Sequence, residues 1–318
     1  MLARRARGFH LPELMIALAL GLVLLAAFLA VLQRCRASFV ANESLARLQD
    51  GARHALSVLT PDIEHAGFYG FSSHAMATLV GPLPAGAGDC GSGFAVNLGA
   101  PVQGSDNSFA LGTDAPDCAP AATAGGARAG TDTLTLRRAS QDEVAPHAGR
   151  LQVYSQALAV AQALLLFADG RAPGPLDATH VVRDLEVRSY YIANNSVERP
   201  GWPALRVKAL TESGGAAQFR DEEILPGVED LQVAFVVAHA DDSSTRLRIV
   251  TPGTALAADE HIVAVRLWLR ICADVTEPGY QDDTAMSYAN VSFTPSPTEA
   301  RQRRMLIERT VALRNLPP

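Results

Sequence analysis

The sequence predicts an α+β fold in which one long N-terminal helix, half membrane-spanning and half amphipathic, packs on antiparallel β-sheet. The first observation is a run of nineteen uncharged residues, Leu14–Leu32. The second is that short β-rich segments alternate with turn residues from about residue 131 onward. The chain has 318 residues and 48% of them are hydrophobic, so a sizeable core is expected and a disordered chain is excluded. The net charge of −6 implies no basic surface of nucleic-acid-binding size.

The uncharged run would form a helix about 28 Å long, which matches the apolar core of a bilayer. Arginines flank the run on both sides. A cleaved secretory signal peptide would have a shorter apolar core, and Cys35–Ala37 is a poor cleavage site. An uncleaved signal anchor fits the length and the basic flank. A third interpretation, cleavage just before the run, also explains Gly8 after the basic leader and Glu13 at the apolar boundary.

A carboxylate at the edge of a membrane helix is costly unless it reaches water or finds a partner. Glu13 is either solvated at headgroup depth or paired with an amine. Cleavage between Gly8 and Phe9 would create a new amine four residues before Glu13. An amine on a neighbouring subunit would then neutralise the carboxylate and set a stagger between subunits, because an unpaired buried charge is heavily penalised. The basic leader should stay in the cytoplasm, so the rest of the chain should emerge on the other side of the membrane.

The string Gly8–Leu18 resembles the class III leader of type IV prepilins and of type II secretion pseudopilins. This resemblance implies that the prepilin peptidase cuts after Gly8 and methylates Phe9. It also implies that Glu13 directs assembly. Pro12 replaces the more usual aliphatic residue before the glutamate, and proline is tolerated in the first turn of a helix because its missing N–H would be unpaired there.

The helix is predicted to continue past the apolar run, because apolar residues recur there at three- and four-residue steps: Leu45, Leu48, Ala52, Leu56, Leu59 and Ile63. Pro61 should kink or briefly break this helix, and Gly67 should end it. We therefore expect a cleaved leader over residues 1–8, a transmembrane and assembly helix over 9–33, its amphipathic continuation over 34–67, and a periplasmic globular domain over 68–318.

Residues 70–130 contain twelve of the 25 glycines and are predicted to be loop-rich, with a few short strands such as Phe94–Leu98. Cys90 and Cys118 lie in this region, and a disulfide between them is a candidate in an oxidising periplasm. Closing a loop of this length would contribute about 3–4 kcal/mol. Cys35 at the membrane exit and Cys272 in an apolar segment are expected to be unpaired packing residues.

Residues 131–318 are predicted to be strand-rich, and turn pairs such as Pro226–Gly227 indicate antiparallel pairing. The expected strands are Thr131–Arg137, Leu151–Tyr154, Ala163–Ala168, Val181–Leu185, Glu186–Ile192, Ala204–Leu210, Leu231–Val237, Leu247–Val250, Ile262–Cys272 and Met305–Leu313. Within Ile262–Arg270, the side chains of Val263, Val265, Leu267 and Leu269 should face the core. The other face of that segment, which carries Arg266, Trp268 and Arg270, should be wetter.

Three further segments resemble PilW-type minor pilins. Leu59–Gly70 is similar to the run Asp-Ile-x-x-Ala-Gly-aromatic-x-Gly at the end of their N-terminal helix. Gly227–Val233 is similar to their Gly-Val-Glu-Asp-Leu strand entry, and Thr310–Asn315 is similar to their C-terminal strand. These segments span the chain from start to finish. The resemblance implies a pilin-like fold and a precursor that is stored in the membrane before it joins a pilus.

The resemblance also implies partners and a location. The partners are other minor pilins, the major pilin, the prepilin peptidase, an inner-membrane assembly platform driven by a cytoplasmic ATPase, and a tip adhesin. The chain would cross the inner membrane once, with its C-terminal domain in the periplasm, and would prime pilus polymerisation at the pilus tip.

No catalytic motif stands out. The sequence has no P-loop, no dinucleotide-binding glycine pattern, no His-Glu-x-x-His and no Gly-x-Ser-x-Gly. The runs Asp241–Asp242 and Asp282–Asp283 lack the spacing of a calcium loop, so exposed turns are the better interpretation. We expect no enzyme activity, cofactor or metal site. The alternatives are a J-type minor pseudopilin of type II secretion, which the leader and helix cannot separate from a pilin, and a signal-anchored periplasmic enzyme, which would retain residues 1–8.

Overall fold

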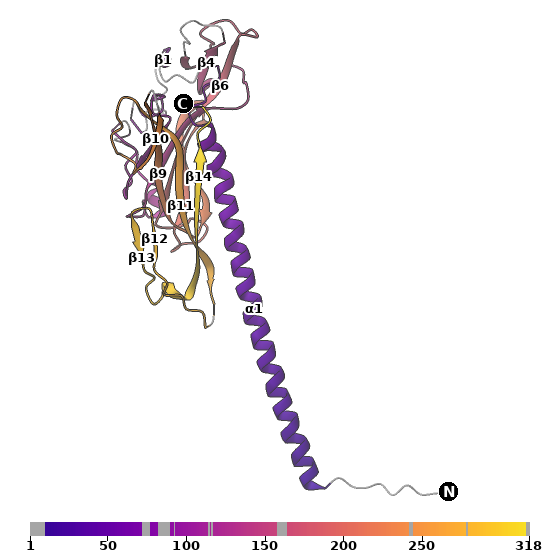
Figure 1. The fold of residues 1–318 in the computed structure, drawn as a ribbon. Coiled ribbons are helices and arrows are strands. Elements are labelled where there is room, and N and C mark those ends of the chain that lie inside the picture. Colours follow the sequence, from indigo (N-terminus) through magenta and orange to yellow (C-terminus); the bar gives the residue numbers. More distant parts are fainter. Residues whose placement is uncertain are drawn as a thin grey trace.

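A computed structural model of the chain describes residues 10–71, 77–81, 90–91, 93–113, 115, 117–157, 164–241, 244–277 and 279–315. One helix, α1 (Leu11–His65), is followed by a domain built almost entirely of strands. The first half of α1 extends away from this domain, and its second half lies along it (Figure 1). The predicted α+β arrangement of a long N-terminal helix on antiparallel sheet is therefore confirmed.

The helix is longer and less interrupted than Pro61 suggests. It continues through Pro61 to His65, so the predicted break at the proline is wrong. Proline in the last turns removes one backbone hydrogen bond, but the neighbouring side chains of Leu59 and Ile63 are fully buried and hold this end of the helix against the domain. The chain then turns at Gly67, whose φ of 80° is the left-handed conformation that suits glycine after a helix.

The strands form two main sheets and one hairpin. An eight-stranded sheet has the order β1-β5-β4-β6-β3-β2, with β7 joined to β6 and β8 joined to β7. Its strands are β1 (Ala77–Leu79), β2 (Val102–Ser105), β3 (Thr133–Ala139), β4 (Ala148–Gln156), β5 (Leu164–Asp169), β6 (His180–Ala193), β7 (Ala204–Ser213) and β8 (Ala216–Pro226). Every described pairing is antiparallel except that of β1 with β5.

The second sheet has four antiparallel strands in the order β10-β9-β11-β14, and a separate hairpin pairs β12 with β13. These strands are β9 (Val228–Asp241), β10 (Ser244–Val250), β11 (Glu260–Thr276), β12 (Met286–Tyr288), β13 (Val291–Phe293) and β14 (Gln302–Ala312). Two short 3₁₀ turns complete the described structure, at Ala122–Ala124 and Glu299–Arg301.

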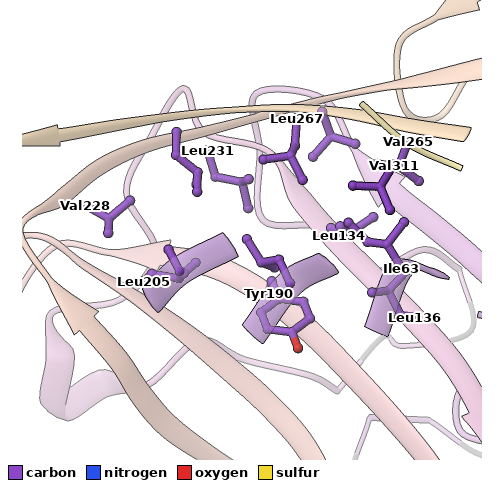
Figure 2. Packing of buried hydrophobic residues seen from close by; sticks show 14 of the residues in the cluster. Ile63, Leu134, Leu136, Tyr190, Leu205, Val228, Leu231, Val265, Leu267 and Val311 are labelled. Carbon is purple, nitrogen blue, oxygen red and sulfur yellow. The ribbon is translucent and has the colours of Figure 1, made fainter. Parts of the chain in front are cut away.

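The main core lies between the two sheets and the second half of α1. Figure 2 shows side chains of the four-stranded sheet, among them Leu231 and Leu267, close to Leu134 and Tyr190 of the eight-stranded sheet and to Ile63 of α1. The helix residues buried here are Ser44, Leu48, Ala52, Ala55, Leu59, Asp62 and Ile63. Their three- and four-residue spacing confirms the predicted amphipathic stripe, although Leu45 faces solvent.

Several local predictions differ from the structure. The two strands expected at Val181–Leu185 and Glu186–Ile192 are one strand, β6, because neither segment contains a glycine or proline to separate them. Phe94–Leu98 forms turns instead of a strand. Its backbone binds the side chain of Arg137, whose Nε donates to the Phe94 carbonyl across 2.9 Å. Five of the described strands were not predicted from the sequence: β1, β2, β8, β12 and β13.

The face of β11 that points away from the main core is more buried than predicted. Val265, Leu267 and Leu269 do face the core, but Trp268 and Arg270 on the other face are also buried. The hairpin of β12 and β13 covers them, and Tyr288 packs against Trp268. The guanidinium of Arg270 lies 3.6 Å from the centre of the Phe293 ring. The wetter face predicted for β11 is therefore limited to the part around Arg266 that the hairpin does not reach.

The predicted loop-rich region forms a second, smaller core. Phe94, Ala95, Leu98 and Leu111 pack with residues of β4, β5 and β6. Cys90 and Cys118 are joined by a disulfide in this region. Cys35 and Cys272 are free, and Cys272 is buried in β11. Cys35 is exposed on α1, so in the isolated chain it is not a packing residue.

Candidate assembly site

The first half of α1 presents a bare apolar surface. Its most apolar stretch has a mean hydropathy of 2.9, and none of that stretch is buried within the chain. Leu24 and Phe28, for example, are 71% and 60% exposed. Among the described residues, α1 is the helix long and apolar enough to cross a membrane. An apolar surface of this size requires lipid or other apolar helices around it.

Glu13 lies at the start of this surface, in the first turn of α1. Its carboxylate accepts a hydrogen bond of 3.1 Å from the backbone N–H of His10, which precedes the helix. This contact satisfies a donor that a helix N-terminus leaves free, and it places a negative charge at the positive end of the helix dipole. Gly8 and Phe9, the predicted processing residues, lie outside the described residues. Glu13 thus lies at the opposite end of α1 from the globular domain.

The other end of α1 is fixed by a buried carboxylate. Asp62 is only 2% exposed. It accepts hydrogen bonds from Arg138 of β3 at 3.0 Å, from Arg188 of β6 at 2.8 Å and from the hydroxyl of Tyr190. Burial and the adjacent Asp62 carboxylate raise the pKa of Tyr190 far above its usual value, so its hydroxyl stays a donor. The carboxylate therefore joins α1 to two neighbouring strands.

Three segments noted in the sequence, Leu59–Gly70, Gly227–Val233 and Thr310–Asn315, are called the signature segments. The residues that follow Asp62 in the first of them also have structural roles. The N–H of Gly67 donates to the carbonyl of Arg137 at 3.0 Å, and the hydroxyl of Tyr69 donates to the carbonyl of Leu98 at 3.2 Å. Gly70 has a φ of 87°, and a Cβ at this position would clash with the hydroxyl of Ser155. This segment thus links the helix end to β3 and to the loop-rich region.

The second signature segment begins the four-stranded sheet. The N–H of Gly227 donates to the carbonyl of Pro203 at 2.7 Å, and a Cβ on Gly227 would lie 3.0 Å from the carbonyl oxygen of Cys272. Glu229 accepts hydrogen bonds from Arg270 at 3.0 Å and from Arg304 at 2.8 Å. The glycine permits close strand contact, and the glutamate ties β9 to β11 and β14.

The C-terminal signature segment returns to the helix. Val311 of β14 is buried in the main core. The backbone N–H of Arg314 donates to the carbonyl of Glu64 at 3.1 Å, and the side chains of Arg314 and Glu64 form an ion pair at 3.0 Å. All three signature segments therefore act at junctions, between helix and strand or between strands.

One unexpected titratable group lies among these junctions. Asp132 is 1% exposed, and its carboxylate accepts hydrogen bonds of 2.7 Å from the backbone N–H groups of Asn107 and Val233. Burial raises the pKa of Asp132 to about 7, although the two N–H donors oppose this shift. In the part of the chain that the structure describes, no three His, Cys, Asp or Glu side chains are grouped so as to hold a metal ion. Through its two hydrogen bonds, Asp132 joins the loop that contains Asn107 to β9.

The sequence predicts a carboxylate, Glu13, at the start of the helix and a disulfide between Cys90 and Cys118. It does not predict the partners of Asp62 or the role of Asp132. The adjacent arginines Arg137 and Arg138 at the end of a predicted strand were the available signal. They point to opposite faces of β3, and each binds a different neighbour: Arg137 the loop-rich region and Arg138 the helix end.

The C-terminal part of the chain is similar to a known protein family. Residues 189–315 match the family model described as Type IV Pilus-assembly protein W, which confirms the predicted PilW-type resemblance over this segment. Among solved structures, the chain is similar to a type IV-like pilin, TTHA1219 from Thermus thermophilus. The identity is 13% and the TM-score is 0.36, and the alignment covers 86% of this chain and 100% of the pilin. No curated protein matches the chain.

Proposed function

We propose that this chain is a minor pilin, a type IV pilus assembly protein that primes pilus polymerisation together with other minor pilins and sits at the pilus tip. One observation carries the proposal: a helix with a bare apolar first half is continuous with a helix packed on a domain whose C-terminal part matches the PilW model. Because Gly8–Leu18 resembles a class III leader, the proposal includes cleavage by the prepilin peptidase between Gly8 and Phe9.

The bare half of α1 suggests how the subunit moves from the membrane into a filament. This surface is compatible with lipid and with a bundle of similar helices, so transfer between the two changes its free energy little. Glu13 adds a requirement for register, because its charge must keep a partner once water is excluded. The amine of a processed Phe9 on a neighbouring subunit would be that partner. The assembly platform and its ATPase would supply the energy of extraction.

The proposed location follows from the leader. The basic residues before α1 would stay in the cytoplasm and the strand-rich domain would lie in the periplasm. The proposed partners are other minor pilins, the major pilin and a tip adhesin. The match to a pilus assembly family favours this role over a J-type pseudopilin of type II secretion. The proposal also assigns the chain a structural role, in contrast to a signal-anchored enzyme.

Mass spectrometry of the N-terminus of the chain, purified from membranes of cells that express the prepilin peptidase, tests the proposal. We expect an N-methylated Phe9. Gly8→Ala should still be cleaved, whereas Gly8→Leu should leave the leader attached. A wild-type chain that keeps residues 1–8, or that begins near Ser38, would contradict the proposed processing and the pilin role with it.

A further inference from the structure

A groove lies beside α1 where strand β6 changes its neighbour. β4 pairs with β6 as far as Asp184, and β7 pairs with β6 from Arg188 onward. β3 and the segment after it occupy the opposite edge of β6 throughout this stretch. The two strands β4 and β7 thus separate along one edge of β6. They meet again at Gly149, where a Cβ would clash with the carbonyl of Gly215 in the turn between β7 and β8.

The space between these strands is a cavity of about 540 Å³ that opens to solvent. Apolar and charged side chains share its walls. The apolar side chains come from five elements and include Val58 of α1, Leu151 of β4, Leu185 of β6, Val207 of β7 and Ile224 of β8. A pocket with apolar walls and charged edges is typical of sites that receive an anchoring side chain from a partner protein.

The charges around the groove are not balanced. Its lining includes four carboxylates, on Asp184, Glu186, Glu212 and Glu222, and two guanidiniums, on Arg150 and Arg188. Both arginines are already engaged. Arg150 pairs with Asp184 at 2.7 Å, and Arg188 pairs with Asp62 at 2.8 Å and with Glu186 at 3.5 Å.

Two carboxylates on the far side of the groove remain without a cation. Glu212 accepts the backbone N–H of Gly215 at 2.8 Å, and Glu222 is exposed. Neither forms an ion pair with any residue that the structure describes. The groove therefore combines apolar walls with two carboxylates that complement a positive charge.

We propose that this groove receives a neighbouring subunit of a different sequence. That subunit would insert an apolar side chain between β4 and β7 and place a lysine or arginine against Glu212 and Glu222. The inference rests on the proposed pilin function, in which subunits pack along α1. Val58 places the groove directly beside that helix, and the unbalanced carboxylates select a cationic partner segment.

Photo-crosslinking in cells tests the contact with the full-length chain and its assembly machinery. p-Benzoylphenylalanine replaces Thr211, which lines the groove, Leu176 in an exposed loop as a control, or Leu25 on the bare half of α1. We expect Thr211 to give an adduct with another pilin-like subunit, through a peptide that contains lysine or arginine, and Leu176 to give none. An adduct with a second copy of this chain, or no adduct, overturns the groove proposal.

Charge variants test the role of the two carboxylates. Glu212→Gln with Glu222→Gln preserves side-chain size, and we expect it to lower the Thr211 adduct about fivefold. The matched double variant Asp142→Asn with Glu198→Gln changes two exposed carboxylates outside the groove and should leave the adduct unchanged. An adduct that persists in the groove variant overturns the electrostatic part of the proposal.

The Leu25 position separates this inference from the proposed function. Adducts at Leu25 without adducts at Thr211 would leave the pilin role standing and remove the groove as a contact. Loss of adducts at both positions would overturn both proposals.

Discussion

Arg188 of β6 donates a hydrogen bond of 2.8 Å to the carboxylate of Asp62, which lies 126 positions earlier near the end of α1. The hydroxyl of Tyr190 and the guanidinium of Arg138 bind the same carboxylate. A buried charge is tolerated when its partners are present and becomes strongly unfavourable when they are lost. This cluster therefore holds the helix, and with it the bare apolar half, at a defined angle to the domain.

We expect Asp62→Ala to lower the free energy of unfolding by about 2–4 kcal/mol, because two arginines would lose their buried anion. Chemical unfolding of the full chain in detergent, followed by circular dichroism, measures this change. Asp50→Ala is the matched control, since Asp50 is exposed and lies 3.7 Å from Arg53. It should change stability by less than about 0.5 kcal/mol. Equal effects of the two substitutions would contradict the assigned role of Asp62.

We expect Asp132 to make stability depend on pH. Its pKa is raised to about 7 in the folded chain by burial, against an ordinary value of 3.8. The folded state therefore holds this proton more tightly than the unfolded state. The contribution of Asp132 to the free energy of unfolding is most favourable below pH 4 and is lost as the pH rises from about 4 to 7. Asp132→Asn removes the titration, so the stability of the wild type relative to this variant should fall across that range. A difference independent of pH would refute the assignment.

We expect Cys90→Ser to lower the free energy of unfolding by about 3–4 kcal/mol, because the disulfide closes a loop over a sequence separation of 28. Thermal unfolding with and without dithiothreitol measures the effect. The reductant should destabilise the wild type and leave the variant unchanged. Cys35→Ser, which removes an exposed free thiol, should behave as the wild type does. A wild type insensitive to reduction would show that the bridge adds no stability.

We expect Leu59→Ala to lower the free energy of unfolding by about 2–5 kcal/mol. The side chain of Leu59 is fully buried where α1 packs on the sheets, and its removal leaves a cavity. Leu45→Ala is the control on the same helix, since Leu45 is 41% exposed. Its effect should be less than about 1 kcal/mol. Urea unfolding of both variants gives the comparison, and similar costs would mean that the stripe on α1 has been assigned to the wrong face.

We expect Glu13→Ala to leave processing intact and to reduce incorporation into pili severalfold, because the register-setting charge is lost. The amount of the chain in sheared pili, relative to the amount in membranes, measures this effect. Glu43→Ala, farther along the exposed side of α1, is the control. Normal pilus number and normal incorporation in Glu13→Ala cells would count against the pairing role.

Features that depend on nearby residues were predictable. The apolar run, the stripe on the second half of α1 and the strand periodicity of β9, β11 and β14 arise from residues a few positions apart. The same holds for Gly67 and Gly227, whose conformations are set by the turns in which they lie. The charge of Glu13 at the start of the helix was also visible, because its position relative to the apolar run is a local property.

Features that depend on distant residues were not predictable. The continuity of α1 through Pro61 reflects burial of its last turns against strands far along the chain. Arg270 and Trp268 are buried because a hairpin of later residues folds back over β11. The groove beside α1 exists because β6 pairs with β4 along one part and β7 along the next. Local sequence specifies which segments form helix or strand. Burial and charge pairing depend on which segments meet, and that is settled only when the whole chain packs.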